Sequence, residues 1–164
     1  MSTVTSFYDT SLGYILDEDG LRPDPEGIKP VLEMPSPENI KDLRRVLGMF
    51  GWYSRLIKNE ADRKIPLVKL LRKDTPWEWN AEQEEAFQGL KQALTDTPVL
   101  ARPDFSKTFT IHADSSQYAI GTVLTQEHED GEYPIVYISK VLTPAERNYS
   151  TTDREMLAIM FAVR

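Results

Sequence analysis

In the first half of the chain, apolar residues recur every three or four positions, the spacing that places side chains on one face of a helix. The pattern predicts a helix that begins at Ser36-Pro37, with serine as N-cap and proline at the first helical position. Its apolar face carries Ile40, Leu43, Leu47 and Phe50. Shorter helices are expected around residues 52–57 and 65–71, and a helical turn over 26–32. These elements together predict a compact helical unit.

Two further elements flank these helices. Residues 12–21 predict a hairpin, in which Gly20 closes a turn that needs positive φ, and residues 1–11 show no period and are expected to fray. After a linker that contains Pro76, Asn80 and Gln83 have the spacing of a capping box and predict another helix. The apolar stripe of this helix comprises Ala86, Phe87, Leu90, Ala93 and Leu94.

After Pro103 the apolar period changes from 3.6 to 2, which predicts strands. One strand contains Phe109 and Ile111, two more cover 119–126 and 133–139, and a last helix begins near Thr152. Because the strands are joined by short links, an antiparallel meander is favoured. The chain is therefore expected to have an α+β fold. Three strands and one helix are few for an independently folded domain, so a face or an edge of the sheet is expected to remain uncovered.

The charges are distributed unevenly along the chain. Its net charge is −7, yet residues 41–73 contain ten Lys or Arg against three acidic residues, whereas residues 76–164 contain seven against fourteen. This asymmetry indicates two units with different roles. On charge alone, an ordinary solvated helix face is favoured over a binding surface, because a binding patch needs clustering in three dimensions.

Composition excludes several classes of site. The chain of 164 residues has no cysteine, which excludes disulfides, thiolate zinc sites and cysteine nucleophiles, and its two histidines exclude a histidine-rich metal site. No stretch approaches the roughly 20 apolar residues of a membrane span, and the N-terminus has no secretory pattern. We therefore expect an intracellular protein, in the cytoplasm or nucleus, without a membrane partner.

Two carboxylates stand out by position. Asp114 ends the first strand after Pro103, and Glu155 lies in the first turn of the last helix. A strand end and a helix start can face each other across a sheet, and carboxylate oxygens suit magnesium. On spacing alone, structural roles are favoured over a shared metal site. Asp114 could form an Asx turn, and Glu155 could complete a capping box with Thr152.

The remaining candidate side chains have more ordinary explanations. His112 alternates with apolar neighbours and is expected to be a strand-surface residue rather than a ligand. The tryptophans at 52, 77 and 79 could stack on bases. Their positions at helix starts and packing turns favour core anchoring instead.

The first half resembles the reverse transcriptase of gypsy-like LTR retrotransposons. The similar segments are LGYIL at 12–16, DPEGI at 24–28, LRRVLG at 43–48, WYSRLI at 52–57 and LLRK at 70–73. They match the primer-grip hairpin and the thumb of that family. The resemblance implies that residues 1–27 form a tail and a primer-grip-like hairpin and that 28–74 form a thumb-like helical unit.

The second half resembles the start of the retroelement ribonuclease H domain. The similar segments are ADSS at 113–116, IGTVL at 120–124, YISK at 137–140, LTPAERNYS at 142–150 and EMLA at 155–158. The resemblance implies that residues 75–164 are the N-terminal part of an RNase H-like domain, built from a helix, a three-stranded meander and a helix. It places Asp114 and Glu155 on the first two metal-binding carboxylates of that family.

The resemblance also implies a function. The family cleaves the RNA strand of an RNA–DNA hybrid with two magnesium ions, and its thumb grips the template–primer backbone. We expect the nucleic-acid-binding residues to be Arg44, Arg45, Arg55, Lys58 and Lys64, and the partners to be the hybrid and the rest of the pol polyprotein. The polymerase Asp pair has no counterpart here, and later carboxylates are expected beyond Arg164. The isolated chain is therefore expected to be inactive.

Two other hypotheses remain open. The chain could be a non-catalytic, transposon-derived module that binds nucleic acid or protein. Its second half could also be an RNase H-like connector in which Asp114 and Glu155 are structural.

Overall fold

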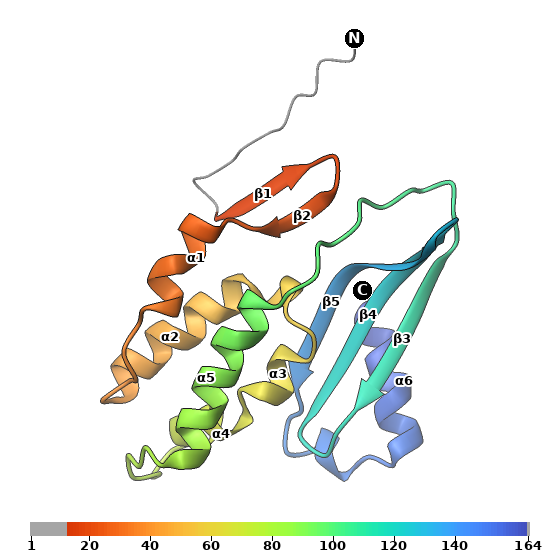
Figure 1. Ribbon diagram of the computed structural model, residues 1–164. Helices are drawn as coiled ribbons and strands as arrows, with labels where there is room; N and C mark the ends of the chain where they lie inside the picture. Colours follow the sequence, from red (N-terminus) through yellow and green to blue (C-terminus); the bar gives the residue numbers. More distant parts are fainter. Residues whose placement is uncertain (1–12, 164) are drawn as a thin grey trace.

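The computed structural model describes residues 13–163, so the expectation of a frayed segment at 1–11 lies outside the described residues. A two-stranded hairpin, a group of helices and a three-stranded sheet follow one another along the chain (Figure 1). The hairpin pairs β1 (Tyr14–Asp17) with β2 (Gly20–Pro23) in antiparallel register. The predicted α+β fold and the hairpin turn are confirmed.

The helical part contains more and shorter elements than the periodicity predicts. The elements are α1 (Pro25–Leu32), α2 (Ile40–Trp52), the 3₁₀ turn η2 (Ser54–Leu56), α3 (Glu60–Arg63), α4 (Ile65–Val68), the 3₁₀ turn η3 (Lys69–Leu71) and α5 (Ala81–Thr95). The predicted helix at 65–71 is one α-helical turn followed by a 3₁₀ turn. In α5 the predicted capping box is present, with Gln83 Oε1 accepting from the Asn80 N–H at 3.0 Å.

The predicted start of the second helix is wrong. Its N-cap is Asn39, whose side chain accepts from the Asp42 N–H at 2.9 Å. Ser36 instead donates its hydroxyl to Glu84 on α5 at 2.7 Å. Asparagine is as good a cap as serine, and the contact with α5 draws Ser36 out of the helix. The same Glu84 oxygen accepts from the Trp79 indole at 2.6 Å, so one carboxylate holds three segments together.

One apolar core unites the helices, and α5 belongs to it. Phe87, Leu90 and Leu94 of α5 are fully buried in the same cluster as Leu43 and Phe50 of α2. Phe50 and Phe87 meet edge to face with ring centroids 6.5 Å apart. Trp77 and Trp79 pack against this cluster, which confirms core anchoring for these two. The domain boundary expected at 74/75 therefore separates α5 in sequence from the helices with which it packs.

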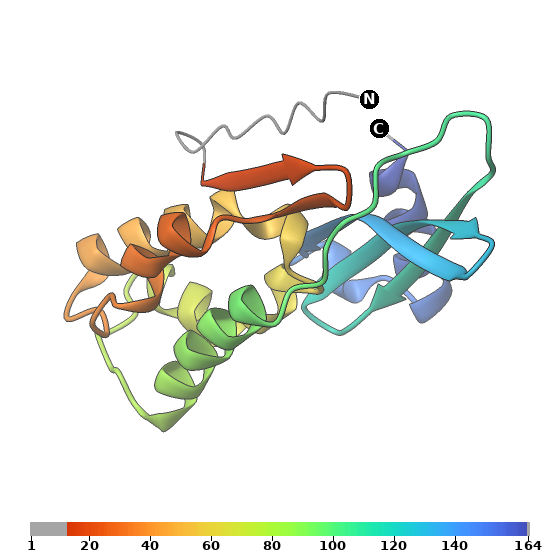
Figure 2. The same cartoon turned by 45° about the horizontal axis from the view of Figure 1, so that its top comes forward.

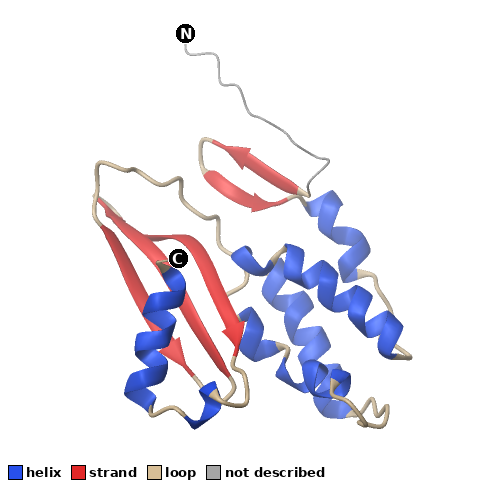
Figure 3. Cartoon of the chain, turned by 180° about the vertical axis from the view of Figure 1, so that it is seen from behind, coloured by secondary structure: helices blue, strands red, loops and turns tan. Residues whose placement is uncertain are grey.

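The sheet is the predicted meander. Its order is β3 (Phe109–Ser115), β4 (Ala119–His128) and β5 (Gly131–Val141), with both pairs antiparallel. Helix α6 (Thr151–Ala162) lies across one face, as the view from behind shows (Figure 3). Ala158 of α6 is buried with Ile120, and its carbonyl accepts from the Thr122 hydroxyl at 3.2 Å. A second, smaller core therefore lies between α6 and the sheet.

The other face of the sheet receives the helical unit. The Ala61 N–H at the start of α3 donates to Ser139 Oγ of β5 at 2.9 Å. The segment from α5 to β3 passes beside the hairpin (Figure 2), where Leu21 and Leu100 exchange backbone hydrogen bonds of 2.8 Å. The helical unit thus packs against β4 and β5, while Thr110, His112 and Asp114 of β3 stay exposed on this face, so part of the sheet is bare as expected. Within residues 13–163, no helix is long and apolar enough to cross a membrane.

We predict that Gly20→Ala lowers the free energy of unfolding by about 2–3 kcal/mol, because Gly20 has a φ of 128° and a Cβ there would lie 2.0 Å from the Leu100 carbonyl oxygen. The matched control is Gly89→Ala in α5, where an added Cβ has no neighbour within 4 Å. It should stabilise the chain by about 0.5–1 kcal/mol through helix propensity. Urea unfolding checks both, and equal effects of the two substitutions would contradict the prediction.

Candidate functional site at the junction of the sheet and the helical unit

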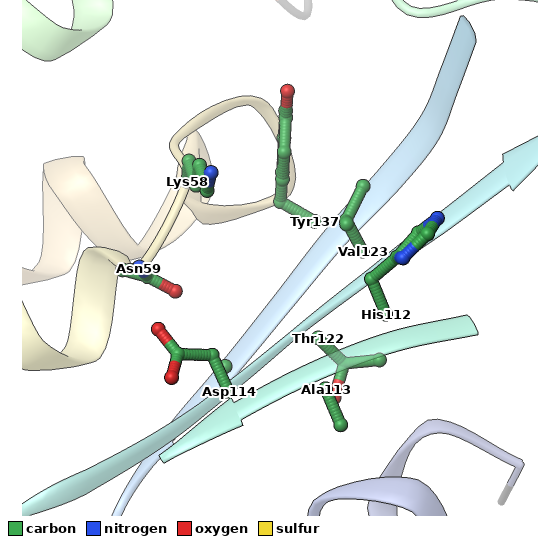
Figure 4. A pocket seen from close by; sticks show the side chains of 9 residues that line it. Lys58, Asn59, His112, Ala113, Asp114, Thr122, Val123 and Tyr137 are labelled. Atoms are coloured by element: carbon green, nitrogen blue, oxygen red, sulfur yellow. The ribbon is translucent and has the colours of Figure 1, made fainter. Parts of the chain in front are cut away.

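Asp114 lies on the sheet face that is turned toward the helical unit. It pairs with Gly121 of β4, and its neighbour Ala113 packs on the opposite face against the α6 core. Figure 4 shows the Asp114 carboxylate directed toward Asn59, while Ala113 and Thr122 point the other way. Asp114 is exposed, and its Oδ1 accepts from the Ser115 N–H at 2.9 Å. That bond to the next residue is not the Asx turn considered from sequence.

Two adjoining hollows border this carboxylate. The larger, of about 110 Å³, is lined by Lys58, Asn59, His112, Ala113, Asp114, Gly121, Thr122, Val123 and Tyr137. The smaller, of about 30 Å³, is lined by Asn59, Asp62, Asp114, Ser115, Ser116, Ala119, Ile120 and Gly121. Asp114 therefore faces side chains of residues 58–62, which belong to the helical unit and lie more than fifty positions earlier in the chain.

The approach of these two parts depends on Asn59 and Gly121, which the sequence patterns did not single out. Asn59 has a left-handed backbone with φ of 55°, a conformation that asparagine tolerates well. A Cβ at Gly121 would lie 2.2 Å from Asn59 Oδ1, so a larger residue here would require the Asn59 side chain to move. A glycine within a predicted strand is the one sequence signal for such a close approach.

Glu155 does not share these hollows. It is exposed on α6, the helix that covers the opposite face of the sheet, and it lines neither hollow that Asp114 lines. The N-cap of α6 is Ser150, which accepts from the Asp153 N–H at 3.2 Å, so the capping box proposed for Thr152 and Glu155 is not the one used. The structure thus does not bring the two carboxylates into one pocket, and their shared role stays a prediction.

His112 is a strand-surface residue, as its alternation predicts. Its Nε2 lies 2.7 Å from Glu132 Oε1 of β5. Hydrogen bonds from the Thr125 hydroxyl and from His112 hold the pKa of Glu132 below its usual range. Burial raises the pKa of the Tyr137 hydroxyl, which borders the same hollow. The larger hollow is therefore bordered by His112, which contacts Glu132, and by the partly buried Tyr137.

The donor atoms at the carboxylates are of the type that magnesium takes. Asp114 and Glu155 offer hard carboxylate oxygens, and neither forms an ion pair with another described residue. Within residues 13–163, however, no group of three or more Asp, Glu, His or Cys is arranged to hold a metal ion. The residues fit magnesium by chemistry, and the present arrangement does not assemble them around one ion.

The basic residues expected to bind nucleic acid are mostly exposed. Arg44 and Arg45 lie on the solvent side of α2, whose Leu43 and Val46 face the core. Arg55 is exposed in η2 and lines a hollow of about 440 Å³ together with Tyr14 and Trp52. The exposed residues Lys58, Arg63, Arg72 and Lys73 extend this basic character along the chain.

Lys64 differs from the other basic residues. Its ammonium lies 3.0 Å from Glu60 Oε2, and Glu60 is only 2% exposed. The other oxygen of Glu60 has no hydrogen-bond partner among the described residues. Because a buried carboxylate without a counter-charge is costly, Lys64 has a structural role in this fold.

We predict that Lys64→Ala lowers the free energy of unfolding by about 2–4 kcal/mol, since it leaves the Glu60 carboxylate buried without its cation. Arg44→Ala, which removes an exposed positive charge from α2, is the control and should change stability by less than about 0.5 kcal/mol. Urea unfolding monitored by circular dichroism measures both. A Lys64→Ala variant as stable as the control would show that the ion pair contributes little.

Comparison with known proteins extends these observations. A family model described as the RNase H-like domain found in reverse transcriptase matches residues 79–164. The Tf2-3 and Tf2-4 transposon polyproteins of Schizosaccharomyces pombe are each 39% identical over 154 residues. That alignment covers 93% of this chain and 12% of each polyprotein. The chain therefore spans about an eighth of the length of these curated relatives.

Solved structures show the same fold. The foamy viral protease-reverse transcriptase in complex with RNA/DNA hybrid matches with a TM-score of 0.76 over 93% of this chain and 21% of its own length. The same protein in complex with dsDNA matches with a TM-score of 0.77 over 93% and 32%. At 20% identity these matches establish the arrangement of the backbone alone. Because the family model covers more than half of the residues, this chain belongs to the family of RNase H-like domains found in reverse transcriptases.

Proposed function

We propose that this chain binds an RNA–DNA hybrid or template–primer as part of a retrotransposon polyprotein. The observation that carries the proposal is the exposure of Arg44, Arg45, Arg55 and Lys58 on the helical unit. These four residues, here termed the basic surface, are positive although the chain as a whole has a net charge of −7. Contacts of this kind neutralise backbone phosphates without reading sequence.

The comparisons support this proposal by analogy. The similar foamy viral protein is described in complex with dsDNA and with RNA/DNA hybrid. The match covers both the helical unit and the sheet, so the surface proposed here has a counterpart in fold in a protein that holds nucleic acid. Binding by this chain is inferred from its own exposed arginines.

For the intact polyprotein we propose hydrolysis of the RNA strand of the hybrid. Asp114 and Glu155 are the residues of this chain that would hold magnesium, which when bound supplies an activated water and stabilises the leaving oxygen. Each carboxylate is exposed and so is accessible to a hydrated cation. Asp114 lines both adjoining hollows, and Glu155 lines neither of them.

We predict that the chain binds a fluorescent RNA–DNA hybrid with a Kd in the micromolar range, of about 1–100 μM, at low salt. Replacing Arg44, Arg45 and Arg55 together by Glu should weaken binding at least about tenfold. It should also reduce the slope of log K against log salt by roughly 3, one for each lost phosphate contact. Fluorescence anisotropy over a salt series measures both quantities.

The matched control replaces the exposed residues Lys29, Arg102 and Lys107 by Glu, which changes the net charge by the same amount away from these three arginines. It should weaken binding much less than the arginine variant. Equal losses in the two variants would show that only the net charge matters. Absence of binding by the unmodified chain at low salt would overturn the proposed function.

A second candidate function is favoured by one observation. Asp114 lies where the helical unit docks on the sheet, and its neighbours there are Asn59 and Lys58. In that setting the sheet and α6 would act as a connector that carries the helical unit. Asp114 and Glu155 would then be surface carboxylates without a metal.

Magnesium distinguishes these two functions. We predict that the isolated chain does not cleave a labelled hybrid in the presence of Mg²⁺, because Asp114 and Glu155 line no common hollow. The NMR signals of Asp114 and Glu155 should respond to a magnesium titration if they retain separate affinity for the ion. No response in the folded chain would favour the connector. Cleavage that Asp114→Asn abolishes would contradict the predicted inactivity.

A further inference from the structure

Lys58 is a cation placed at the edge of the Asp114 hollow by a different part of the fold. It belongs to the turn between η2 and α3, whereas Asp114 ends β3. Both line the hollow of about 110 Å³, and Figure 4 shows them on its two sides with Asn59 between. Their charges are opposite, yet they form no ion pair within the described residues. Each charge is therefore available to a third group.

We propose that Lys58 binds a phosphodiester oxygen of the nucleic acid inside this hollow, so that the helical unit supplies a substrate-binding residue to the Asp114 site. The proposal rests on the proposed function and specifies one of its contacts. It differs from a general role in the basic surface, because it places one phosphate at a defined position beside Asp114 rather than along α2.

The charges around the hollows single out Lys58 as the group through which a phosphate could be held. Asp62 and Asp114 border the smaller hollow, and Asp114 also borders the larger one. Their carboxylates would repel a phosphate that approaches the sheet at this point. Among the described residues that line either hollow, Lys58 is the sole Lys or Arg. Its ammonium is therefore the group that can offset this repulsion.

The size of the larger hollow is also suitable. A volume of about 110 Å³ exceeds what one water molecule needs, which is about 10–15 Å³ on a comparable measure, so several waters or one phosphate group can enter. A duplex is far too large to enter. Only a single backbone group that projects from the duplex can do so, which makes the proposed contact local.

The backbone that carries Lys58 is fixed relative to Asp114. The Ser116 hydroxyl donates to Asp62 Oδ1 at 2.6 Å, and the Ala61 N–H donates to Ser139 Oγ at 2.9 Å. Arg63 Nε donates to the Lys58 carbonyl at 2.9 Å. The first two bonds hold residues 61 and 62 against the sheet unit, and the third ties the Lys58 backbone to the same segment. A lysine on such a support loses less backbone freedom when it binds a phosphate.

The test measures the affinity of this chain for a short RNA–DNA hybrid by fluorescence anisotropy, and the shifts of its backbone amide signals by NMR. The variant is Lys58→Ala, and the matched control is Lys41→Ala, which removes the same charge from an exposed position on α2. We expect Lys58→Ala to weaken binding about tenfold and to remove the hybrid-induced shifts of Asp114, Gly121 and Thr122. Lys41→Ala should weaken binding by no more than about threefold and keep these shifts.

Lys58→Arg should retain most of the affinity, because arginine preserves the cation at the same place. Lys58→Gln should behave as Lys58→Ala does and serves if the alanine variant does not fold. Equal losses for Lys58→Ala and Lys41→Ala, with the shifts of Asp114 retained, would overturn this inference and leave the proposed function intact. No binding by the unmodified chain would overturn the proposed function and this inference with it.

Discussion

The docking of the 58–62 turn on the sheet is the contact on which the arrangement of this chain depends. Beside it, Tyr137 of β5 packs against the helical core, and Lys69 of the helical unit lies over the Tyr118 ring at 5.3 Å. The contact uses backbone and short polar side chains rather than a large apolar surface, as in the hydrogen bond between Ala61 and Ser139. Such bonds are directional and fix an orientation, whereas apolar burial alone allows sliding. Gly121 leaves room for the contact, because a Cβ there would displace the Asn59 side chain from its present position.

This contact also brings residues of opposite charge close together. The chain separates a basic helical unit from an acidic sheet unit along the sequence, and the fold then brings one member of each together at the Asp114 hollow. Elsewhere the basic residues remain on the outside, as Arg44 and Arg45 do on α2. One exception is Lys64, which is paired with buried Glu60 and therefore contributes to stability. Positive residues that are neighbours in sequence thus differ in environment, some exposed to solvent and one paired with a buried carboxylate.

The family unit and the packing unit do not coincide. The RNase H-like family model begins at residue 79 and so includes α5, but the apolar face of α5 is buried against α2. Helix α5 therefore lies within the RNase H-like region of the sequence but packs in the core of the helical unit, so it links the two units. We expect the sheet unit to depend on the helical core for part of its stability, because its own core with α6 contains few buried residues.

The sequence by itself determined the type and order of the elements, because periodicity and capping are local properties. The hairpin, the meander and the α5 capping box follow from spacing alone, while the α2 cap fell on Asn39 because α5 engages Ser36. The family could also be identified from the sequence, because short motifs occur in it in the same order as in the family. Only the tertiary structure decided which sheet face Asp114 occupies, that Glu155 lies on a helix across the other face, and that Lys58 borders the Asp114 hollow. Alternation along a strand separates two faces, but what packs on each face depends on contacts between residues far apart in the chain.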